Sequence, residues 1–274
     1  MLVRNPIGLL DYQNYIRLII IIAHQLTPAG GHGLNSGIQD VYDLTWKLAA
    51  FLRGWGGNGL LDSYNRERRS VAGLNTSMVE KATMEVLLTW VTKAHQIGSE
   101  NLAAATEDGE RCRGELRDAI MPGRWIHNQT GTVMGYRYNG SPIVIADPST
   151  PEPPTSITEY IPSTWPGARA PHLFLSNGRT SIFDLYGPDF TIVDFTATGT
   201  VSEEFIAVAS KLDIPITKVH LPKETHCRAI WERDVVLVRP DGFVAWRIPP
   251  EGAQLVESEI KMVLQMAVGR ASDT

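Results

Sequence analysis

The stretch AHQLTPAGGHGLNSGIQDVYDLTWKLAAFL, residues 23–52, decides the fold expected for the amino-terminal part of this chain. It opens with a loop that contains Pro28, Gly30, Gly31 and Gly33. Because glycine lacks a Cβ atom, such a loop can press its backbone against a flat ligand. The rest predicts a long amphipathic helix, since alternating steps of four and three put these residues on one face: Leu34, Ile38, Val41, Thr45, Leu48 and Leu52.

The ends of this helix also have local signals. Ser36 and Gln39 have the spacing of a capping box, and Asn35 is an alternative N-cap. The Gly-rich residues 54–57 end the helix. The loop therefore delivers a ligand to a helix N-terminus, where free N–H groups and the helix dipole favour negative charge. The plainer alternative is a tight turn followed by a capped helix.

The composition of the chain limits the types of protein that it can be. The chain has 274 residues with 43% apolar and 20% charged residues, as in an ordinary globular protein. A net charge of −5 predicts no nucleic-acid partner. Cys112 and Cys227 make no disulfide framework, which favours a reducing, cytoplasmic location. The apolar run at residues 16–23 is shorter than the roughly 20 residues of a membrane span and predicts a buried strand.

The middle of the chain combines helical and extended patterns. Residues 62–116 read as helical, and the charge run at residues 66–69 reads as a solvated face. Residues 131–145 alternate around an Asn139-Gly140 turn signal, which predicts a hairpin. Residues 147–166 contain six prolines and have the composition of a stiff linker, so we place a domain boundary there.

From residue 167 onward the pattern predicts a compact α/β domain. Strands are expected at residues 180–185, 190–195, 216–221, 235–239 and 243–247. Helices are expected at residues 202–212, with Ser202 as the cap, and at residues 256–268. The order strand, helix, strand, hairpin, helix is that of a thioredoxin-like domain.

The pattern AH-x3-P-x-GG-x-G-x-N-x-G-x2-D-x5-WKLA in residues 23–49 resembles the second FAD motif of flavoprotein aromatic hydroxylases, the phenol hydroxylase and p-hydroxybenzoate hydroxylase group. LLDSYNRERRSVA at residues 60–72 resembles the continuation of that motif, with Ser70 where proline is usual. The strings PGARAPHLFL, SIFDLYGPDFTIVDF and DVVLVRPDGFVAWR resemble the carboxy-terminal domain of phenol hydroxylase-type and polyketide hydroxylase-type flavoenzymes. The resemblance covers the chain from Ala23 onward, but only the carboxy-terminal half of the family protein.

The resemblance implies a fold and a domain order. It implies the α/β class: a partial FAD-binding, Rossmann-type domain followed by a thioredoxin-like domain. The expected divisions are residues 1–75 for the FAD-binding fragment, 76–146 for a helical and hairpin segment, 147–166 for the linker, and 167–274 for the thioredoxin-like domain. In the family this last domain is structural and contributes to dimer contacts, which implies a homodimer through it.

The resemblance also implies an activity: NAD(P)H-driven, FAD-dependent hydroxylation of a phenolic or other aromatic substrate, polyketides included. Pro28 would pack near the isoalloxazine ring, and Gly30, Gly31 and Gly33 would let the backbone approach it. The N–H groups of Leu34 and Asn35 would face the negative charge of the reduced flavin. No residue of the chain is matched to a catalytic role.

Two departures favour a rival hypothesis. The family pattern has Gly-Asp where this chain has Ile20 and Ile21, and in the family that aspartate holds the ribityl hydroxyls of FAD. There is also no G-x-G-x-x-G after an amino-terminal strand to seat the FAD pyrophosphate. Residues 1–22 are either divergent or the product of a wrong gene model. The rival is a non-catalytic interaction or dimerisation protein derived from such an enzyme.

Metal and thiol chemistry are not expected. His24 and His32 flank the Gly-rich loop without a cysteine or carboxylate at ligand spacing, so we predict no metal site. Dithiol chemistry needs two neighbouring thiols, and the chain has no C-x-x-C. Cys227 and His226 make only a weak pattern for a nucleophile and its base.

Overall fold

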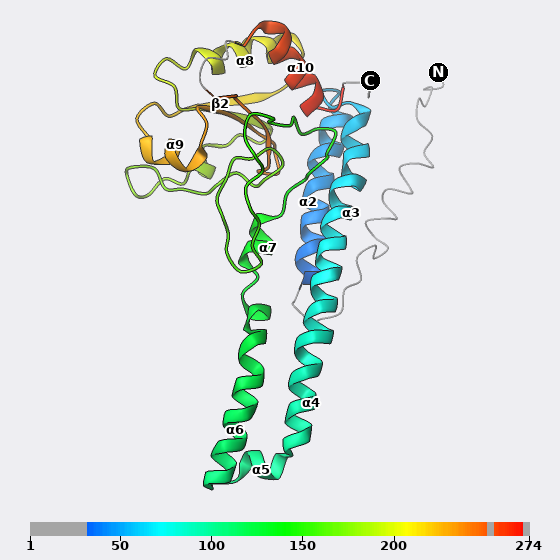
Figure 1. The fold of residues 1–274 in the computed structure, drawn as a ribbon. Helices are drawn as coiled ribbons and strands as arrows, with labels where there is room; N and C mark the ends of the chain where they lie inside the picture. Colours follow the sequence, from blue (N-terminus) through cyan, green and yellow to red (C-terminus); the bar gives the residue numbers. More distant parts are fainter. Residues whose placement is uncertain (1–31, 251–254, 271–274) are drawn as a thin grey trace, which may run out of the picture. The chain divides into compact units, whose positions relative to one another are not determined.

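The computed structural model describes residues 32–250 and 255–270 of the chain (Figure 1). These residues fall into two compact units. The first unit contains residues 32–42 and 71–128, and the second contains residues 43–70 and the described residues from 129 onward. Helices α2 (His32–Leu52) and α3 (Asn58–Lys81) contribute to both. None of the helices in the described ranges combines the length and hydropathy that a membrane span requires.

The first unit is helical, as the sequence predicts for residues 62–116. After α3 the chain forms a π-helical turn at Ala82–Leu87, then α4 (Leu88–Ile97), α5 (Ser99–Ala103), α6 (Glu107–Ile120) and a 3-10 turn at Met121–His127. Gly98 ends α4 with a φ of 83°. Thr106 caps α6, because its hydroxyl accepts the N–H of Gly109 at 3.1 Å.

The second unit is built around one four-stranded sheet. Its elements beyond the shared helices are α7 (Thr130–Gly135), a 3-10 turn at Ile182–Leu185, β1 (Phe190–Asp194), α8 (Thr200–Lys211), β2 (Ile216–His220), α9 (Thr225–Trp231), β3 (Val235–Val238), β4 (Val244–Arg247) and α10 (Glu257–Ala267). The strand order is β2-β1-β3-β4, with β1 and β2 parallel and the other pairs antiparallel. This agrees with the thioredoxin-like order of elements that the sequence predicts.

Both faces of the sheet are buried at β1, β3 and β4, which explains why these strands are mostly apolar, whereas β2 is only partly buried. Ile192 and Leu237 face a core that includes residues of α8 and α10. Val193 and Val236 face the opposite core, which includes Trp231 of α9. Neighbouring residues of a strand point to opposite faces, so a sheet covered on both sides needs apolar residues at successive positions. Figure 1 shows α8 and α10 together beside the sheet.

The first core also contains residues of α2, α3 and their connection. Trp46, Ala50, Trp55 and Leu60 all belong to it. The rings of Trp46 and Trp55 meet Phe190 of β1 edge-on, with centroids 5.9 Å and 6.1 Å apart. The end of α2 and the start of α3 therefore pack directly on the sheet.

Several local predictions are confirmed. Strands β1, β2, β3 and β4 and helices α8 and α10 lie where the sequence patterns place them. Helix α2 ends at Leu52, and the glycines follow, with a φ of 83° at Gly54. The strand predicted at residues 16–23 lies outside the described residues.

Other local predictions are wrong. Residues 130–135 form α7 rather than a hairpin strand, although Asn139 and Gly140 do form a turn. Residues 182–185 form a 3-10 turn whose capping box is made by Ser181 and Asp184, not a strand. Gly199 rather than Ser202 precedes α8, and the Ser202 hydroxyl donates to the Gly199 carbonyl at 2.8 Å. The sequence patterns gave no sign of α9.

The apolar face predicted for α2 is largely exposed in the structure. Leu34, Ile38 and Val41 are 78%, 60% and 52% exposed. The buried residues of this helix lie on another face and include Ser36, Asp40, Asp43, Lys47 and Ala50. The helical spacing was correct, but it identified an exposed face.

The proline-rich segment lies inside the second unit. Asp147 accepts hydrogen bonds from Arg247 Nε at 2.6 Å and Arg233 Nη2 at 3.3 Å. Thr164 donates to the Trp231 carbonyl, and Arg137 donates to Glu152 at 2.8 Å. Groups of β4, of α9 and of the segments beside them thus contact residues 147–166, and the predicted boundary there stays a prediction.

Candidate functional site

The predicted flavin-binding residues divide into two groups. Pro28, Gly30 and Gly31 lie outside the described residues. Gly33, Leu34 and Asn35 lie in the first turn of α2, which begins at His32. The predicted capping role of Ser36 or Asn35 is therefore wrong, because both residues are already helical. Ser36 instead accepts a hydrogen bond from Asn75 Nδ2 at 2.8 Å.

The first turn of α2 presents backbone N–H groups at the positions that the sequence predicts for flavin binding. The N–H groups of Gly33 and Leu34 fall among the first four of the helix, which have no intrahelical acceptor. A Cβ atom at Gly33 would meet no described atom within 4 Å. Helix N-termini favour negative charge. These residues suit the pyrimidine edge of a flavin, where the charge of its reduced form resides.

A buried ion network joins α2, α3 and the turn after β3 in the described part of the second unit. Lys47 of α2 donates to Asp43 at 2.8 Å and to Glu67 of α3 at 2.6 Å. Arg239, which follows β3, donates to Glu67 at 2.6 Å and 3.0 Å, to Asp43 at 3.1 Å, and to Asp241 at 2.5 Å. All five side chains are at most 2% exposed. Buried charges are tolerated only when they are paired in this way.

This network contains three carboxylates and two cations. Burial raises the pKa of Asp43 to about 7, and the negative charges of Glu67 and Asp241 add to the effect against those of Lys47 and Arg239. Burial also raises the pKa of Glu67, but the charges of Arg239 and Lys47 outweigh it and bring the value down to about 2. Asp43 is thus the carboxyl group of the network that binds a proton below about pH 7, which removes the excess negative charge.

Aromatic and hydroxyl groups surround the network. Trp46 Nε1 donates to Asp241 at 3.1 Å, and Ser141 donates to Glu67 at 2.5 Å. Tyr138 lies under the Arg239 guanidinium at 5.1 Å from the ring centroid, and it accepts a hydrogen bond from Arg68 at 3.1 Å. Removing one partner of such a buried pair typically costs about 3–5 kcal/mol of stability.

The prediction that the charge run at residues 66–69 is solvated is therefore correct for only two of its four residues. Arg66 and Arg69 are exposed, but Glu67 and Arg68 are each 2% exposed. A signal was present in the sequence, because Glu67 lies three residues after Tyr64 and four before Val71, both apolar and both buried. A charged residue on an apolar helix face indicates a buried partner, although the sequence does not identify it.

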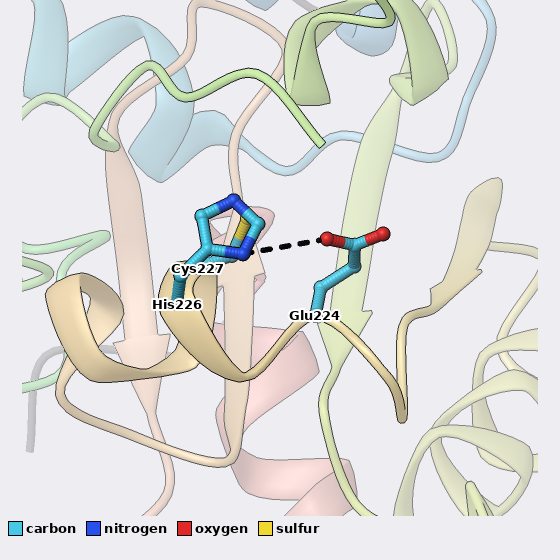
Figure 2. A group of neighbouring side chains, drawn as sticks. All are labelled: Glu224, His226 and Cys227. Carbon is cyan, nitrogen blue, oxygen red and sulfur yellow. Dashed lines mark hydrogen bonds and ion pairs between the residues drawn. The ribbon is translucent and has the colours of Figure 1, made fainter. Parts of the chain in front are cut away.

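Cys227 and His226 come together with Glu224 (Figure 2). Cys227 is buried, and its Sγ lies 3.3 Å from His226 Nε2. Burial raises the pKa of the Cys227 thiol, and the Glu224 charge raises it further. A thiol that keeps its proton is a poor nucleophile. The pair therefore does not have the electrostatics of a catalytic thiol and its base.

Comparison with known proteins agrees with the resemblance noted in the sequence. Residues 22–82 match the FAD binding domain family, and residues 163–271 match the aromatic-ring hydroxylase C-terminal family. An FAD-dependent monooxygenase of Emericella nidulans is 37% identical over 81% of this chain and 36% of its own length. The 2,4-dichlorophenol 6-monooxygenase of Cupriavidus pinatubonensis is 30% identical over 91% of this chain and 46% of its own length.

A solved structure supports the same assignment at the level of the fold. The rebeccamycin biosynthetic enzyme RebC with reduced flavin is 33% identical and superposes with a TM-score of 0.72. The match covers 90% of this chain and 44% of RebC. This chain thus spans less than half the length of these relatives. The chain belongs to the FAD-dependent aromatic-ring hydroxylases, the flavoprotein monooxygenase family whose second FAD motif and carboxy-terminal strings its sequence contains.

Proposed function

We propose that this chain supplies the second FAD motif and the carboxy-terminal domain of a cytoplasmic FAD-dependent monooxygenase, which hydroxylates a phenolic or other aromatic substrate with NAD(P)H as reductant. The observation that carries the proposal is the pair of family matches, at residues 22–82 and 163–271. Residues of both matched segments contribute to the buried ion network. Reduced flavin supplies the oxygen chemistry when it is bound. A homodimer through residues 167–274 is part of the proposal.

The chain's own residues would hold only one edge of the cofactor. Gly33 would let the backbone approach the flavin ring, and the N–H groups of Gly33 and Leu34 would face its negative charge. Asn35 lies at the end of that turn, and Pro28, Gly30 and Gly31 complete the proposed set.

The rest of the dinucleotide has fewer contacts in this chain. Ile21 stands where the family has an aspartate for the ribityl hydroxyls, which removes a hydrogen bond to a charged group worth about 1.5–3 kcal/mol. That loss corresponds to roughly a tenfold to hundredfold weaker affinity. The sequence has no G-x-G-x-x-G for the pyrophosphate. We therefore expect weak FAD binding by the 274-residue chain alone.

A second candidate function is a non-catalytic interaction or dimerisation protein. The exposed apolar side chains of α2, among them Leu34, Ile38 and Val41, favour it, because apolar surface on a helix is suited to a protein partner. The two candidates differ in whether flavin is bound at all.

Flavin fluorescence quenching by the purified chain distinguishes them. We expect saturable quenching by the wild-type chain, weakened by Gly33→Ala, which places a methyl group where the ring would approach. Gly37→Ala is the matched control, since a Cβ there also meets no described atom within 4 Å. Equal quenching by both variants, or none by the wild type, would contradict the proposed flavin edge.

A fusion tests the activity. The amino-terminal half of the Emericella nidulans relative is joined to this chain with Ile20→Gly and Ile21→Asp. We expect substrate-stimulated NAD(P)H oxidation and a hydroxylated phenol only in the fusion. A fusion that remains colourless and consumes no NAD(P)H would favour the interaction protein.

A further inference from the structure

The first half of α2 has its apolar residues on the side that faces solvent. Leu34, Ile38 and Val41 lie within about 60° of one another round the helix, and all three are more than half exposed. Ser36 and Asp40 lie about 150° away from them and are buried. In an ordinary amphipathic helix the apolar side faces the protein, so the arrangement here is reversed.

Helix α3 already occupies the buried side of this stretch. Ser36 accepts a hydrogen bond from Asn75 Nδ2 of α3 at 2.8 Å, so the apolar side points away from that helix. The exposed residues between positions 34 and 42 carry no charge; they are Leu34, Asn35, Gly37, Ile38, Val41 and Tyr42. We call the four exposed large apolar side chains the α2 stripe: Leu34, Ile38, Val41 and Tyr42. An uncharged apolar surface of this kind is suited to an apolar partner.

A segment of the same chain has the chemistry that this surface requires. Residues 16–22 read IRLIIII, and Arg17 is their only charged residue. They lie outside the described residues, and residues 23–31 connect them to the start of α2 at His32. A connection of that length spans up to about 30 Å, whereas Leu34 and Val41 are about 10 Å apart along the helix axis. The segment can therefore turn back and reach the whole α2 stripe.

We propose that residues 16–22 dock on the α2 stripe. A short connection gives the segment an effective concentration of about millimolar, which favours it over a separate protein or a second copy of the chain. Alternate residues of an extended segment point to the same side. Leu18 and Ile20 therefore contact the helix together, whereas the Arg17 guanidinium on the other side remains in solvent.

Docking also fixes the loop between the two partners. Residues 23–31 contain Pro28, Gly30 and Gly31, and both ends of this loop then lie against α2. A loop that is held at both ends loses less conformational entropy when a ligand binds. For the proposed flavin role, on which this consequence alone rests, the segment would preorganise the Gly-rich loop.

Disulfide cross-linking in the full chain tests the contact without flavin. Leu18→Cys and Ile38→Cys are introduced together with Cys112→Ser, and Cys227 stays because it is buried. We expect an oxidant to form a disulfide within one chain. This product migrates faster on a non-reducing gel, and its yield does not depend on the protein concentration.

The matched control pairs Leu18→Cys with Ser77→Cys. Ser77 is exposed and lies about 200° round α3 from Asn75, hence on the side away from α2. The control pair should form about tenfold less disulfide, because its thiols do not meet in the docked chain. Equal yields in both pairs, or no disulfide in either, would overturn the proposal. A disulfide between chains that increases with concentration would also overturn it, and would assign the α2 stripe to a second copy.

Trypsin gives a second measurement that needs no added cysteine. Cleavage after Arg17 requires release of the segment, because a protease binds residues on both sides of the cleaved bond, whereas cleavage after Arg4 does not require it. Ile38→Asp places a charge in the α2 stripe and should speed cleavage after Arg17 about tenfold, with cleavage after Arg4 unchanged. Ser77→Asp is the control on α3 and should change neither rate. An unchanged rate after Arg17 in Ile38→Asp would show that the segment does not bind the α2 stripe.

Discussion

At the scale of single residues, the balance of charges in the buried ion network determines the pKa of Asp43. Lys47 and Arg239 face the carboxylates of Asp43, Glu67 and Asp241, and each cation contacts more than one of them. Three negative groups against two positive ones leave one carboxylate poorly compensated in a buried position. Burial and the neighbouring carboxylates raise the pKa of Asp43 to about 7 for this reason.

The raised pKa of Asp43 gives stability a definite pH dependence. The folded chain holds the Asp43 proton up to about pH 7, whereas the unfolded chain loses it near the ordinary aspartate pKa of 3.8. Its contribution to the free energy of unfolding is therefore complete below about pH 4 and is lost as the pH rises to about 7. We expect Asp43→Asn to flatten this decline in urea titrations between pH 4 and 7.

The slope, rather than the absolute stability, is the measurement, because an amide facing Lys47 also loses a charge-assisted hydrogen bond. Asp62→Asn is the control, since Asp62 is an exposed carboxylate of α3. It should keep the wild-type slope. A decline between pH 4 and 7 that survives in Asp43→Asn would place the titrating group elsewhere.

At the scale of elements, the connection between α2 and α3 is shaped by the end of α10. The Gly57 N–H donates to the Val268 carbonyl at 2.7 Å, and the Gly59 N–H donates to the Gly269 carbonyl at 3.0 Å. A Cβ atom at Gly57 would lie 2.2 Å from the Gly269 oxygen. The backbones are therefore too close for any side chain, which explains a glycine here by packing rather than by a ligand.

The space around each glycine predicts that alanine has opposite effects on stability at Gly57 and at Gly114. Gly57→Ala should lower the thermal unfolding midpoint, because the backbone of the α2–α3 connection must move away from Gly269. Gly114→Ala in α6, where a Cβ meets nothing within 4 Å, should raise stability by about 0.5–1 kcal/mol. A neutral Gly57→Ala variant would show that the connection does not pack against α10 as described.

At the scale of the whole molecule, the compact units do not follow the order of the sequence. The second unit joins residues 43–70 to the chain after residue 128. Trp46, Trp55 and Leu60 enter the same core as Phe190, and the ion network adds polar contacts between the same segments. A thioredoxin-like sheet thus has part of one face covered by the FAD-binding fragment.

We predict that residues 167–274 fold by themselves, and the structure identifies what the isolated segment would lose. Phe190 would lack Trp46 and Trp55, and burial of each such side chain is worth about 1.5–3 kcal/mol. We expect the isolated segment to melt below the full chain and to bind an apolar dye. A peptide of residues 43–70 added in trans should displace the dye. Equal melting temperatures without dye binding would show that this cover contributes nothing.

Local sequence signals are enough to identify the family and the elements of the carboxy-terminal sheet. The motif of residues 23–49 and the strings around Phe190 and Val235 identify the family because many positions agree at fixed spacings. Strands β1 to β4 were predictable because their apolar runs and the Pro240-Asp241-Gly242 turn are local signals. Of the candidate site, the placement of Gly33 and Leu34 near a helix start followed from the same local pattern.

Burial of the charged residues and exposure of the apolar ones depend instead on tertiary contacts between distant segments. Glu67 reads as one member of a solvated charge run until Arg239, 172 residues away, is placed against it. Likewise, Leu34 and Ile38 have core spacing but are exposed, and Glu224, His226 and Cys227 meet only because α9 forms. Helical periodicity tells which residues share a face, but burial of that face depends on partners that the fold brings from distant parts of the chain.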